Sequence, residues 1–274
     1  MSLTEQTRLS QFDRHKAIAE QVIGTGTSRI EDLAERFGVS MMTIHRDLDT
    51  LATQGLLRKS RGIVTAVATS LFEASTAYRM TRNVAEKRAL ARAAFEHVEP
   101  GQAIIMDDST TGLYLAELLP QRPPMTVITN FQAVLKALTG QPDLSLISLG
   151  GHYYQWCDAF MGNLTIQAVR ALRADVAFMS TSAITDGVCF HQADETVLVK
   201  RAMFESAKRR ILYVDHTKFE RRALHALAPL SDFDVVIVDD QTSLEERRRI
   251  ERADVTLLVA ADDDRGVVVG DKSG

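Results

Sequence analysis

In the first quarter of the chain, apolar residues recur with the spacing of one buried helix face. The first such set, at positions i, i+3, i+4 and i+7, is Ile30, Leu33, Ala34 and Phe37. Ser28 with Glu31 three residues later predicts a capping box at the start of this helix. A second inward-facing set predicts another helix, and it consists of Met41, Ile44, Leu48 and Leu51. Gly38 ends the first helix and Ser40 caps the second, so we expect two short helices joined by a tight turn, after an earlier helix over residues 14–23.

The second of these helices leaves small, polar and cationic side chains on its open side. Beyond it, residues 57–65 fit two short strands that turn at Arg61-Gly62. A short helix, a tight turn, an outward-facing helix and a basic hairpin indicate a winged helix-turn-helix, whose second helix enters the DNA major groove. The candidate DNA-binding residues are Ser40, Met42, Thr43, His45, Arg46, Arg58, Lys59 and Arg61. The alternative is a three-helix protein-interaction module in which these charges are solvated.

Charge supports the DNA-binding interpretation only through its placement. The chain has 274 residues and a net charge of −4, with the 45% hydrophobic and 25% charged residues of an ordinary globular protein. Residues 1–65 hold nine Lys and Arg against eight Asp and Glu. Three cations nevertheless fall within residues 58–61, and a few phosphate contacts suffice for strongly salt-dependent binding.

The chain carries no pattern of a secreted or membrane protein. No segment resembles a signal peptide or approaches the roughly 20 apolar residues that span a bilayer. We therefore expect a cytoplasmic protein without a membrane partner. Its two cysteines, Cys157 and Cys189, are expected to be reduced and buried.

From residue 100 onward, short apolar runs alternate with stretches of helical pattern. The apolar runs cover residues 103–106, 127–129, 144–149, 176–179, 211–214, 235–238 and 255–259. The helical stretches cover residues 76–95, 112–119, 163–172, 196–207 and 243–253. This alternation predicts an α/β fold with a mainly parallel sheet covered on both faces. We expect a DNA-binding domain over 1–65, a linker over 66–75, the α/β domain over 76–260 and a solvated tail over 261–274.

In such sheets, ligands bind at the carboxyl ends of the strands. Those ends carry hydroxyls, glycines, aspartates and lysines, which suit a small polyhydroxylated anion. The candidate ligand-binding residues are Asp107, Asp108, Ser109, Thr110, Thr111, Asn130, Gly150, Gly151, Ser180, Thr181, His191, Lys200 and Lys218. Backbone amides at a helix start and the hydroxyls of residues 109–111 make a phosphate cradle. The alternative is that Ser109 or Thr110 only caps the helix.

Several motifs along the chain resemble those of the DeoR family of bacterial sugar-metabolism repressors. In the first part they are Leu33-Ala34, Phe37-Gly38-Val39-Ser40, Thr43-Ile44-His45-Arg46-Asp47-Leu48 and Gly55-Leu56-Leu57-Arg58. In the second part they are Asp107-Asp108-Ser109-Thr110-Thr111, Val127-Ile128-Thr129-Asn130, Leu149-Gly150-Gly151, Lys200-Arg201-Ala202-Met203 and Asp215-His216-Thr217-Lys218-Phe219. The resemblance extends from about residue 14 to residue 240 in the family's order.

The resemblance implies a transcription regulator rather than an enzyme, without a cofactor. It implies a sensor domain with the fold of sugar-phosphate isomerases such as ribose-5-phosphate isomerase. A phosphorylated sugar would bind there and alter the affinity of a dimer or tetramer for operator DNA, which would repress a carbohydrate-utilisation operon. The resemblance assigns the phosphate loop to residues 109–111 and the pocket cation to Lys200, with Asp107 and Lys218 in the same cleft.

This sequence departs from the family pattern at four places. His45 stands where the family usually has Arg, and Ile63 follows Gly62 where the wing commonly has a second glycine. Thr196 and Leu198 occupy places that often carry glutamates before Lys200. Residues 180–183 replace a loop richer in glycine and aspartate. The last two departures bear on which sugar is bound.

Two other functions compete with sensing. A working isomerase would need a pair of tuned carboxyl groups, and the candidates are Asp107, Asp108, Asp186 and Glu195. A metal site would draw on Cys157, Cys189, His152 and His191, whose spacing matches no common zinc pattern. We expect neither activity, because fold similarity alone does not carry catalysis and because the Cys189-Phe190-His191 run also fits a strand.

Overall fold

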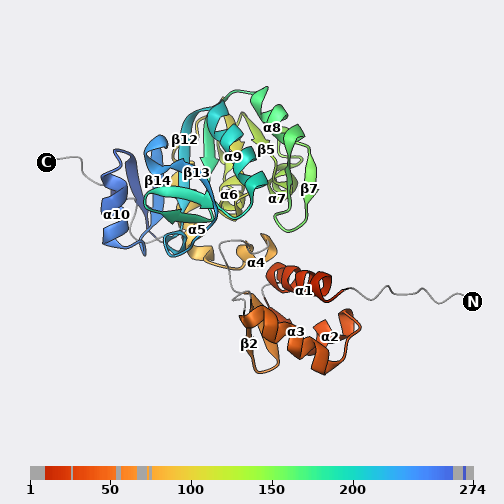
Figure 1. Ribbon diagram of the computed structural model, residues 1–274. Coiled ribbons are helices and arrows are strands. Elements are labelled where there is room, and N and C mark those ends of the chain that lie inside the picture. The colour runs from red at the N-terminus through yellow and green to blue at the C-terminus, as the bar shows by residue number, and fades with distance from the viewer. Residues whose placement is uncertain are drawn as a thin grey trace, which may run out of the picture. The chain divides into compact units, whose positions relative to one another are not determined.

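The computed structural model describes residues 10–25, 27–53, 57–66, 73, 76–261 and 268–269. It divides into two compact units, the first ending at Arg79 and the second beginning at Met80 (Figure 1). We call described residues 10–66 the head and residues 80–261 the sensor unit. Each is described by itself.

The head has three helices and a small antiparallel sheet. The helices are α1 Gln11–Thr25, α2 Ile30–Arg36 and α3 Met41–Thr53. The strands are β1 Thr27–Arg29, β2 Leu57–Ser60 and β3 Ile63–Ala66, in the order β1-β3-β2. The predicted turn joins α2 to α3, with Gly38 at a φ of +59°, and the predicted wing turns at Arg61 and Gly62, both at positive φ. The winged helix-turn-helix is confirmed.

Two details of the head differ from the sequence prediction. Ser28 does not cap α2, because Ser28 belongs to β1, where it pairs with Val64 of β3. The cap position is taken by Arg29, whose side chain makes no capping hydrogen bond. Met41 is 43% exposed, since the inward stripe of α3 meets the core only from Ile44 onward. Asp47 lies in that stripe instead and is 2% exposed. The predicted cap at Ser40 is present, since its hydroxyl accepts a bond from the Thr43 amide at 3.2 Å.

The sensor unit is built on seven parallel strands and one short antiparallel strand. The strands are β4 Ala103–Met106, β5 Met125–Thr129, β6 Leu144–Ser148, β9 Ala174–Met179, β12 Ala207–Val214, β14 Val235–Asp239, β15 Thr256–Ala260 and β16 Val268–Val269. Their order is β16-β15-β14-β12-β9-β4-β5-β6. Each apolar run predicted as a strand is one, so the predicted mainly parallel α/β fold is confirmed.

Helices cover both faces of this sheet (Figure 1). The helices of the unit, with the one at its start, are α4 Thr76–Met80, α5 Val84–Phe95, α6 Thr110–Ala116, α7 Gln132–Leu138, α8 Asn163–Arg170, α9 Asp194–Ser206 and α10 Leu244–Glu251. Helix α6 packs against both α5 and α7, whereas α8 and α9 pack together on the opposite face. The predicted helical stretch over 76–95 is broken in two, because Asn83 adopts a left-handed backbone with φ of 49°.

Several small elements were not predicted from the sequence. They are the strands β7 His152–Tyr154, β8 Ala159–Met161, β10 Ala183–Thr185 and β13 His225–Pro229, and the 3₁₀ turns η1 Leu119–Gln121, η2 His216–Lys218 and η3 Leu230–Asp232. The run Cys189-Phe190-His191, which fitted a strand from sequence, lies in β11 Val188–His191. Strands of three to five residues bounded by polar turns give too short a pattern to read. Strands β10, β11 and β13 form a separate sheet. Along the chain, β10 and β11 lie between β9 and α9, whereas β13 lies between β12 and β14.

The order of the strands creates a switch point between β4 and β9. From β4 the chain proceeds outward through β5 and β6, and it then returns to β9 on the other side of β4 and proceeds through β12, β14 and β15. In open parallel sheets, the crevice outside the carboxyl ends at such a point is where ligands bind. The fold therefore marks the ends of β4 and β9.

The predicted linker and tail lie mostly outside the described residues. Within the predicted linker, Ala66 belongs to β3 and Glu73 pairs with Arg79 at 3.9 Å. Within the predicted tail, Val268–Val269 pairs with Leu258 and Val259 of β15.

Candidate functional site

The open face of α3 carries the residues that were predicted to contact DNA. Met42 is 72% exposed, and His45 and Arg46 are also exposed. Thr43 is half-buried, because its hydroxyl lies 2.9 Å from the Ser40 hydroxyl. A helix that presents His, Arg and Met side chains outward from a packed core has the chemistry needed to meet base edges in a major groove.

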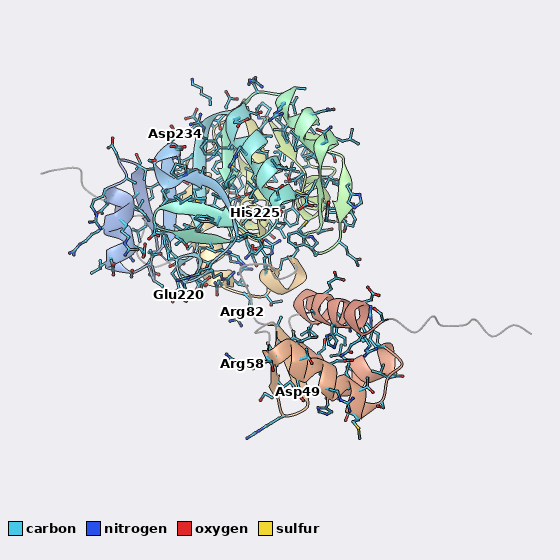
Figure 2. All side chains as sticks on the ribbon, viewed as in Figure 1. Asp49, Arg58, Arg82, Glu220, His225 and Asp234 are labelled. Atoms are coloured by element: carbon cyan, nitrogen blue, oxygen red, sulfur yellow. The ribbon has the colours of Figure 1, made fainter. Side chains whose placement is uncertain are left out.

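The wing divides its three cations instead of displaying them together. Successive side chains of a strand point to opposite faces, so Arg58 and Lys59 of β2 face opposite ways. Arg58 and the turn residue Arg61 are exposed. Lys59 lies over α3, where its ammonium group donates to the Asp49 carboxylate at 2.6 Å and to the His45 carbonyl at 3.4 Å. Figure 2 labels Asp49 on α3 and Arg58 on the wing. Lys59 therefore fastens the wing to the recognition helix.

The Asp49–Lys59 pair leads to a prediction about DNA affinity. The Asp49→Asn change removes a negative charge from the outer face of α3 and releases the Lys59 ammonium group. We expect binding to any duplex to tighten about 3-fold to 10-fold near 0.1 M salt, with a salt slope steeper by about one unit. Titrations by fluorescence anisotropy at several salt concentrations measure both. Asp13→Asn on α1 removes the same charge without touching Lys59, so an equal effect of the two changes would contradict the assignment.

A buried ion pair fixes α1 against α3. The Asp47 carboxylate accepts bonds from Arg14 Nε at 2.6 Å, from Arg14 Nη2 at 3.2 Å and from His15 Nε2 at 2.8 Å. Burial alone would raise the pKa of Asp47, but the bonds from Arg14 and His15 outweigh it and hold that pKa below its usual value. The signal was in the sequence, because Asp47 lies at the i+3 position from Ile44 on an otherwise apolar stripe.

At the switch point of the sensor unit, the structure brings together Asp107, Asp108, Ser180 and Lys200. The Lys200 ammonium group lies 2.5 Å from Asp107 Oδ2, 3.0 Å from Asp108 Oδ1 and 3.3 Å from the Ser180 carbonyl. Lys200 is 3% exposed and Asp107 is fully buried. Two predicted strand ends and the predicted helix of Lys200 therefore meet in one charged cluster inside the protein.

Asp107 also holds the two strand ends in place through backbone amides. Its Oδ1 accepts from the Ser109 amide at 3.0 Å and its Oδ2 from the Ser180 amide at 2.8 Å. Burial raises the pKa of Asp107, an effect that the charge of Asp108 increases and that Lys200 opposes. Burial alone would lower the pKa of Lys200, but the two carboxylates outweigh it, so Lys200 stays protonated.

The hydroxyl of Ser109 is used within the protein. It accepts from the Gly112 amide at 2.9 Å, which is the helix cap considered as the alternative from sequence, and it donates to the Tyr213 hydroxyl at 3.3 Å. Gly112 is required at this turn, since a Cβ there would lie 2.9 Å from the Tyr213 oxygen. The cap is confirmed for Ser109. The side chains of Thr110 and Thr111 are buried beside it.

The loops after β5 and β6 converge on residues 159–165. The Asn130 amide group donates to the Phe160 carbonyl at 2.9 Å, and Thr165 Oγ1 donates to the Gly150 carbonyl at 2.8 Å. Gly151 has a φ of +152°, and a Cβ there would lie 2.6 Å from the Met161 carbonyl oxygen. Close backbone approach is thus the reason for that glycine.

The β10–β11 hairpin positions Thr181 and His191. Thr181 Oγ1 donates to the Phe190 carbonyl at 2.8 Å, and His191 Nδ1 lies 2.9 Å from the Ser182 hydroxyl. Both residues are buried. Cys189 lies within the same strand as His191, and burial raises the pKa of its thiol to about 12, which makes it unreactive.

Lys218 belongs to a second group of residues at the end of β12. There the Asp215 carboxylate accepts from the Asn83 amide group at 3.0 Å and from the Thr217 amide at 3.1 Å. Burial would raise the pKa of Asp215, but the charges of Lys218, Arg221 and Lys87 and the bond from Thr217 lower it.

The side chains that were considered for a metal site or an isomerase differ in exposure. His152 is exposed on β7, whereas Cys157 and Cys189 are buried and are not joined in a disulfide. Over the described residues, no three His, Cys, Asp or Glu side chains come together as metal ligands. Asp186 and Glu195 are exposed, so a catalytic carboxyl pair would have to be Asp107 and Asp108.

Two family models cover most of the chain. Residues 14–70 match the DeoR-like helix-turn-helix domain, and residues 82–240 match the DeoR C terminal sensor domain. The second match alone spans more than half of the 274 residues. The protein therefore belongs to the DeoR family, and it is a DNA-binding transcriptional regulator with a sensor domain.

Curated relatives resemble the chain along most of its length. The putative aga operon transcriptional repressor of Escherichia coli O157:H7 is 30% identical over 91% of this chain and 94% of its own. The glycerol-3-phosphate regulon repressor of Escherichia coli K12 is 30% identical over 84% and 92%. The L-fucose operon activator of Haemophilus influenzae is 29% identical over 90% and 99%.

Among solved structures, ribose 5-phosphate isomerase A of Methanocaldococcus jannaschii aligns with 68% of this chain and 98% of its own. The sequence identity is 11% and the TM-score 0.39. Similarity at this level says nothing about a ligand or a reaction. Over the described residues, no helix is long and apolar enough to cross a membrane.

Proposed function

We propose that the protein is a cytoplasmic repressor of a carbohydrate-utilisation operon, and that a phosphorylated sugar bound at the sensor switch point controls its affinity for operator DNA. The observation that carries the proposal is the buried Asp107–Asp108–Lys200 cluster at the carboxyl ends of β4 and β9. Ligands bind at such points, and buried groups with perturbed pKa values gather at functional sites.

Names of the relatives support the ligand class and the sign of the response. Two of the three relatives named above are repressors, one putatively of the aga operon and one of the glycerol-3-phosphate regulon. The third is an activator of the L-fucose operon. Carboxylates accept hydrogen bonds from sugar hydroxyls, while ammonium groups and backbone amides bind phosphate. The proposed ligand-binding residues are those predicted from sequence, including Lys218 after the end of β12.

On the DNA side, we assign base contacts to α3 and phosphate contacts to Arg58 and Arg61 of the wing. Arg46 is an exposed cation in the middle of α3, where it suits bidentate contact with guanine. Repeated operator sites need repeated heads, so we also propose that the protein acts as a dimer or tetramer. Light scattering of the purified protein measures this.

Control by the ligand requires two arrangements of the oligomer with different affinities for it. One arrangement holds the heads at the spacing of the operator sites, and the other does not. A sugar phosphate that binds the second arrangement more tightly weakens operator binding, at most by the ratio of its affinities for the two arrangements. The reciprocal effect is required, so operator DNA weakens ligand binding by the same factor.

Arg46→Ala tests the DNA assignment. We expect loss of about 1 to 3 kcal/mol in binding to the operator and relaxed discrimination at one base pair, since the bidentate contact is lost. Gel-shift titrations against the upstream region of its own gene and against unrelated DNA measure both. Arg170→Ala, on α8 of the sensor unit, is the control. Equal losses on operator and unrelated DNA would assign Arg46 to phosphate contact only.

A thermal-shift screen against phosphorylated sugars tests the sensor assignment, because a ligand that binds only the folded state raises its melting temperature. A compound that raises it should also change operator binding in gel shifts. Incubation of the same compounds with the protein, followed by sugar analysis, tests the isomerase alternative. Turnover would favour an enzyme, whereas binding without turnover supports the regulator.

A further inference from the structure

Three buried polar atoms near the switch point have no hydrogen-bond partner among the residues that the structure describes. They are Thr196 Oγ1, Gln192 Oε1 and Asn130 Oδ1. Thr196 is 2% exposed, Gln192 8% and Asn130 1%. Buried polar atoms in folded proteins are nearly always hydrogen-bonded, so each such atom needs an explanation.

One of these atoms lies on an element that forms the charged cluster, and the other two lie on segments next to such elements along the chain or in the sheet. Thr196 and Lys200 are four residues apart on the buried face of α9, which places them one turn apart on the same side of the helix. Gln192 directly follows β11 and precedes α9. Asn130 directly follows β5, and Asp107 directly follows the adjacent strand β4. The last residues of the two strands, Thr129 and Met106, are register partners.

The fold itself gives no reason for a hydroxyl at Thr196. Valine has nearly the same shape and a methyl group in place of the hydroxyl, and it would occupy the position without leaving a polar atom unpaired. The neighbours of Thr196 on the buried face include Val197 and Val199. An unpaired buried polar atom destabilises the protein without ligand. Such an atom is expected where a bound ligand forms a hydrogen bond with it.

We propose that Thr196, Gln192 and Asn130 form an uncharged subsite that binds hydroxyl groups of the ligand, and that Thr196 is a specificity-determining residue of the sensor. The inference rests on the proposed function, because it takes the ligand to be a phosphorylated sugar bound beside Lys200. The two carbonyl oxygens accept hydrogen bonds from sugar hydroxyls, and the threonine hydroxyl both donates and accepts. The subsite therefore reads the neutral, polyhydroxylated part of the ligand, while its phosphate is bound elsewhere in the site.

The Thr196→Val variant tests the proposal with two readouts that move in opposite directions. Without ligand, we expect its melting temperature to equal that of the unchanged protein or to exceed it by about 2 °C, since an unpaired buried hydroxyl is removed. With the ligand, we expect Kd to rise about 5-fold by isothermal titration calorimetry, since one hydrogen bond is lost. The probe is whichever of glycerol 3-phosphate, ribose 5-phosphate, fructose 6-phosphate and galactose 6-phosphate raises the melting temperature of the unchanged protein most.

Two matched variants complete the experiment. Thr242→Val makes the same change at another buried, unpartnered hydroxyl, at the end of β14, two strands away from β9. It should affect the melting temperature similarly and leave Kd unchanged. Thr196→Ser keeps the hydroxyl and should bind the probe about as well as the unchanged protein.

The outcomes separate this inference from the proposed function. If the probe binds the unchanged protein and Thr196→Val equally well, the subsite assignment is wrong and the sugar-phosphate sensor stands. If Thr196→Val melts well below both the unchanged protein and Thr242→Val, the hydroxyl serves the fold and the assignment is again wrong. If no phosphorylated sugar raises the melting temperature of the unchanged protein, the proposed ligand class and the subsite both fail.

Discussion

Lys200→Ala is expected to destabilise the sensor unit by about 3 to 5 kcal/mol at neutral pH, the usual cost of leaving a buried charge without its partner. The Asp107 carboxylate is fully buried and lies 2.5 Å from the Lys200 ammonium group, and the variant leaves no cation at that position. Differential scanning calorimetry of the full chain measures the loss as a lower melting temperature.

The loss should shrink as the pH is lowered. Burial raises the pKa of Asp107 in the folded protein above its unfolded value of about 3.9, and removal of Lys200 raises it further. A carboxyl group whose pKa is higher in the folded than in the unfolded protein lowers the free energy of unfolding, fully at pH values above the folded pKa. At pH values below the unfolded pKa it has no such effect. The gap in melting temperature between Lys200→Ala and the unchanged protein is therefore widest near pH 7 and narrows toward pH 4.

Lys208→Ala is the matched control, because Lys208 is an exposed lysine at the start of β12. Its free energy of unfolding should differ from that of the unchanged protein by no more than about 0.5 kcal/mol, so its melting temperature should hardly change. If Lys200→Ala were as stable as this control at every pH, the buried ion pair would contribute nothing to the fold. The expected loss also means that Lys200→Ala alone is a poor test of ligand binding, for which Thr196→Val is better suited.

Asp47→Ala is expected to destabilise the head by about 2 to 3 kcal/mol, which is large for a unit of this size. The carboxylate is 2% exposed and unites Arg14 and His15 of α1 with α3, so the variant loses the link between the two helices. We expect faster hydrogen exchange in peptides from α1 to α3 and weaker binding to all DNA sequences alike. Exchange in the sensor unit should not change.

The folded pKa of Asp47 is shifted in the opposite direction from that of Asp107. The folded pKa of Asp47 is lowered by Arg14 and His15, so its contribution is present above the unfolded value of about 3.9 and is lost as the pH falls through the folded value. The difference between Asp47→Ala and the unchanged protein should persist from pH 7 to pH 5 and decline progressively below pH 4. Asp49→Ala, an exposed position two residues along α3, is the control and should leave exchange in α1 unchanged. Equal effects of the two variants would show that the buried pair does not fix α1 against α3.

Local pattern was sufficient to predict the long elements and the ends of the parallel strands. Runs such as 103–106 and 235–238 are apolar throughout, because both faces of the parallel sheet are covered, and they could be read without knowledge of any contact. The residues after them were singled out because strand ends are where open α/β sheets bind ligands. Short hairpins such as β7–β8 gave no comparable signal, since three residues do not establish a period.

Contacts between distant residues could not be read in the same way. Ser28 with Glu31 fitted a capping box, but pairing of Ser28 with Val64 moved the start of α2. Lys59 fitted a phosphate contact, but Asp49 lies within 2.6 Å of it. In both cases a residue far along the chain or on another element competes with the local pattern, and periodicity contains no information about that competitor.

The sequence by itself determined that this chain has a winged helix-turn-helix followed by a parallel α/β sensor, because helical and strand periods are properties of neighbouring residues. Only the tertiary structure decided which polar residues serve the fold and which stay open to a ligand. Burial makes that decision, since the same carboxylate, ammonium or hydroxyl group costs little in water and must find a partner once water is excluded. Asp47 and Asp107 find theirs within the protein, whereas the Thr196 hydroxyl has none in the described part of the chain.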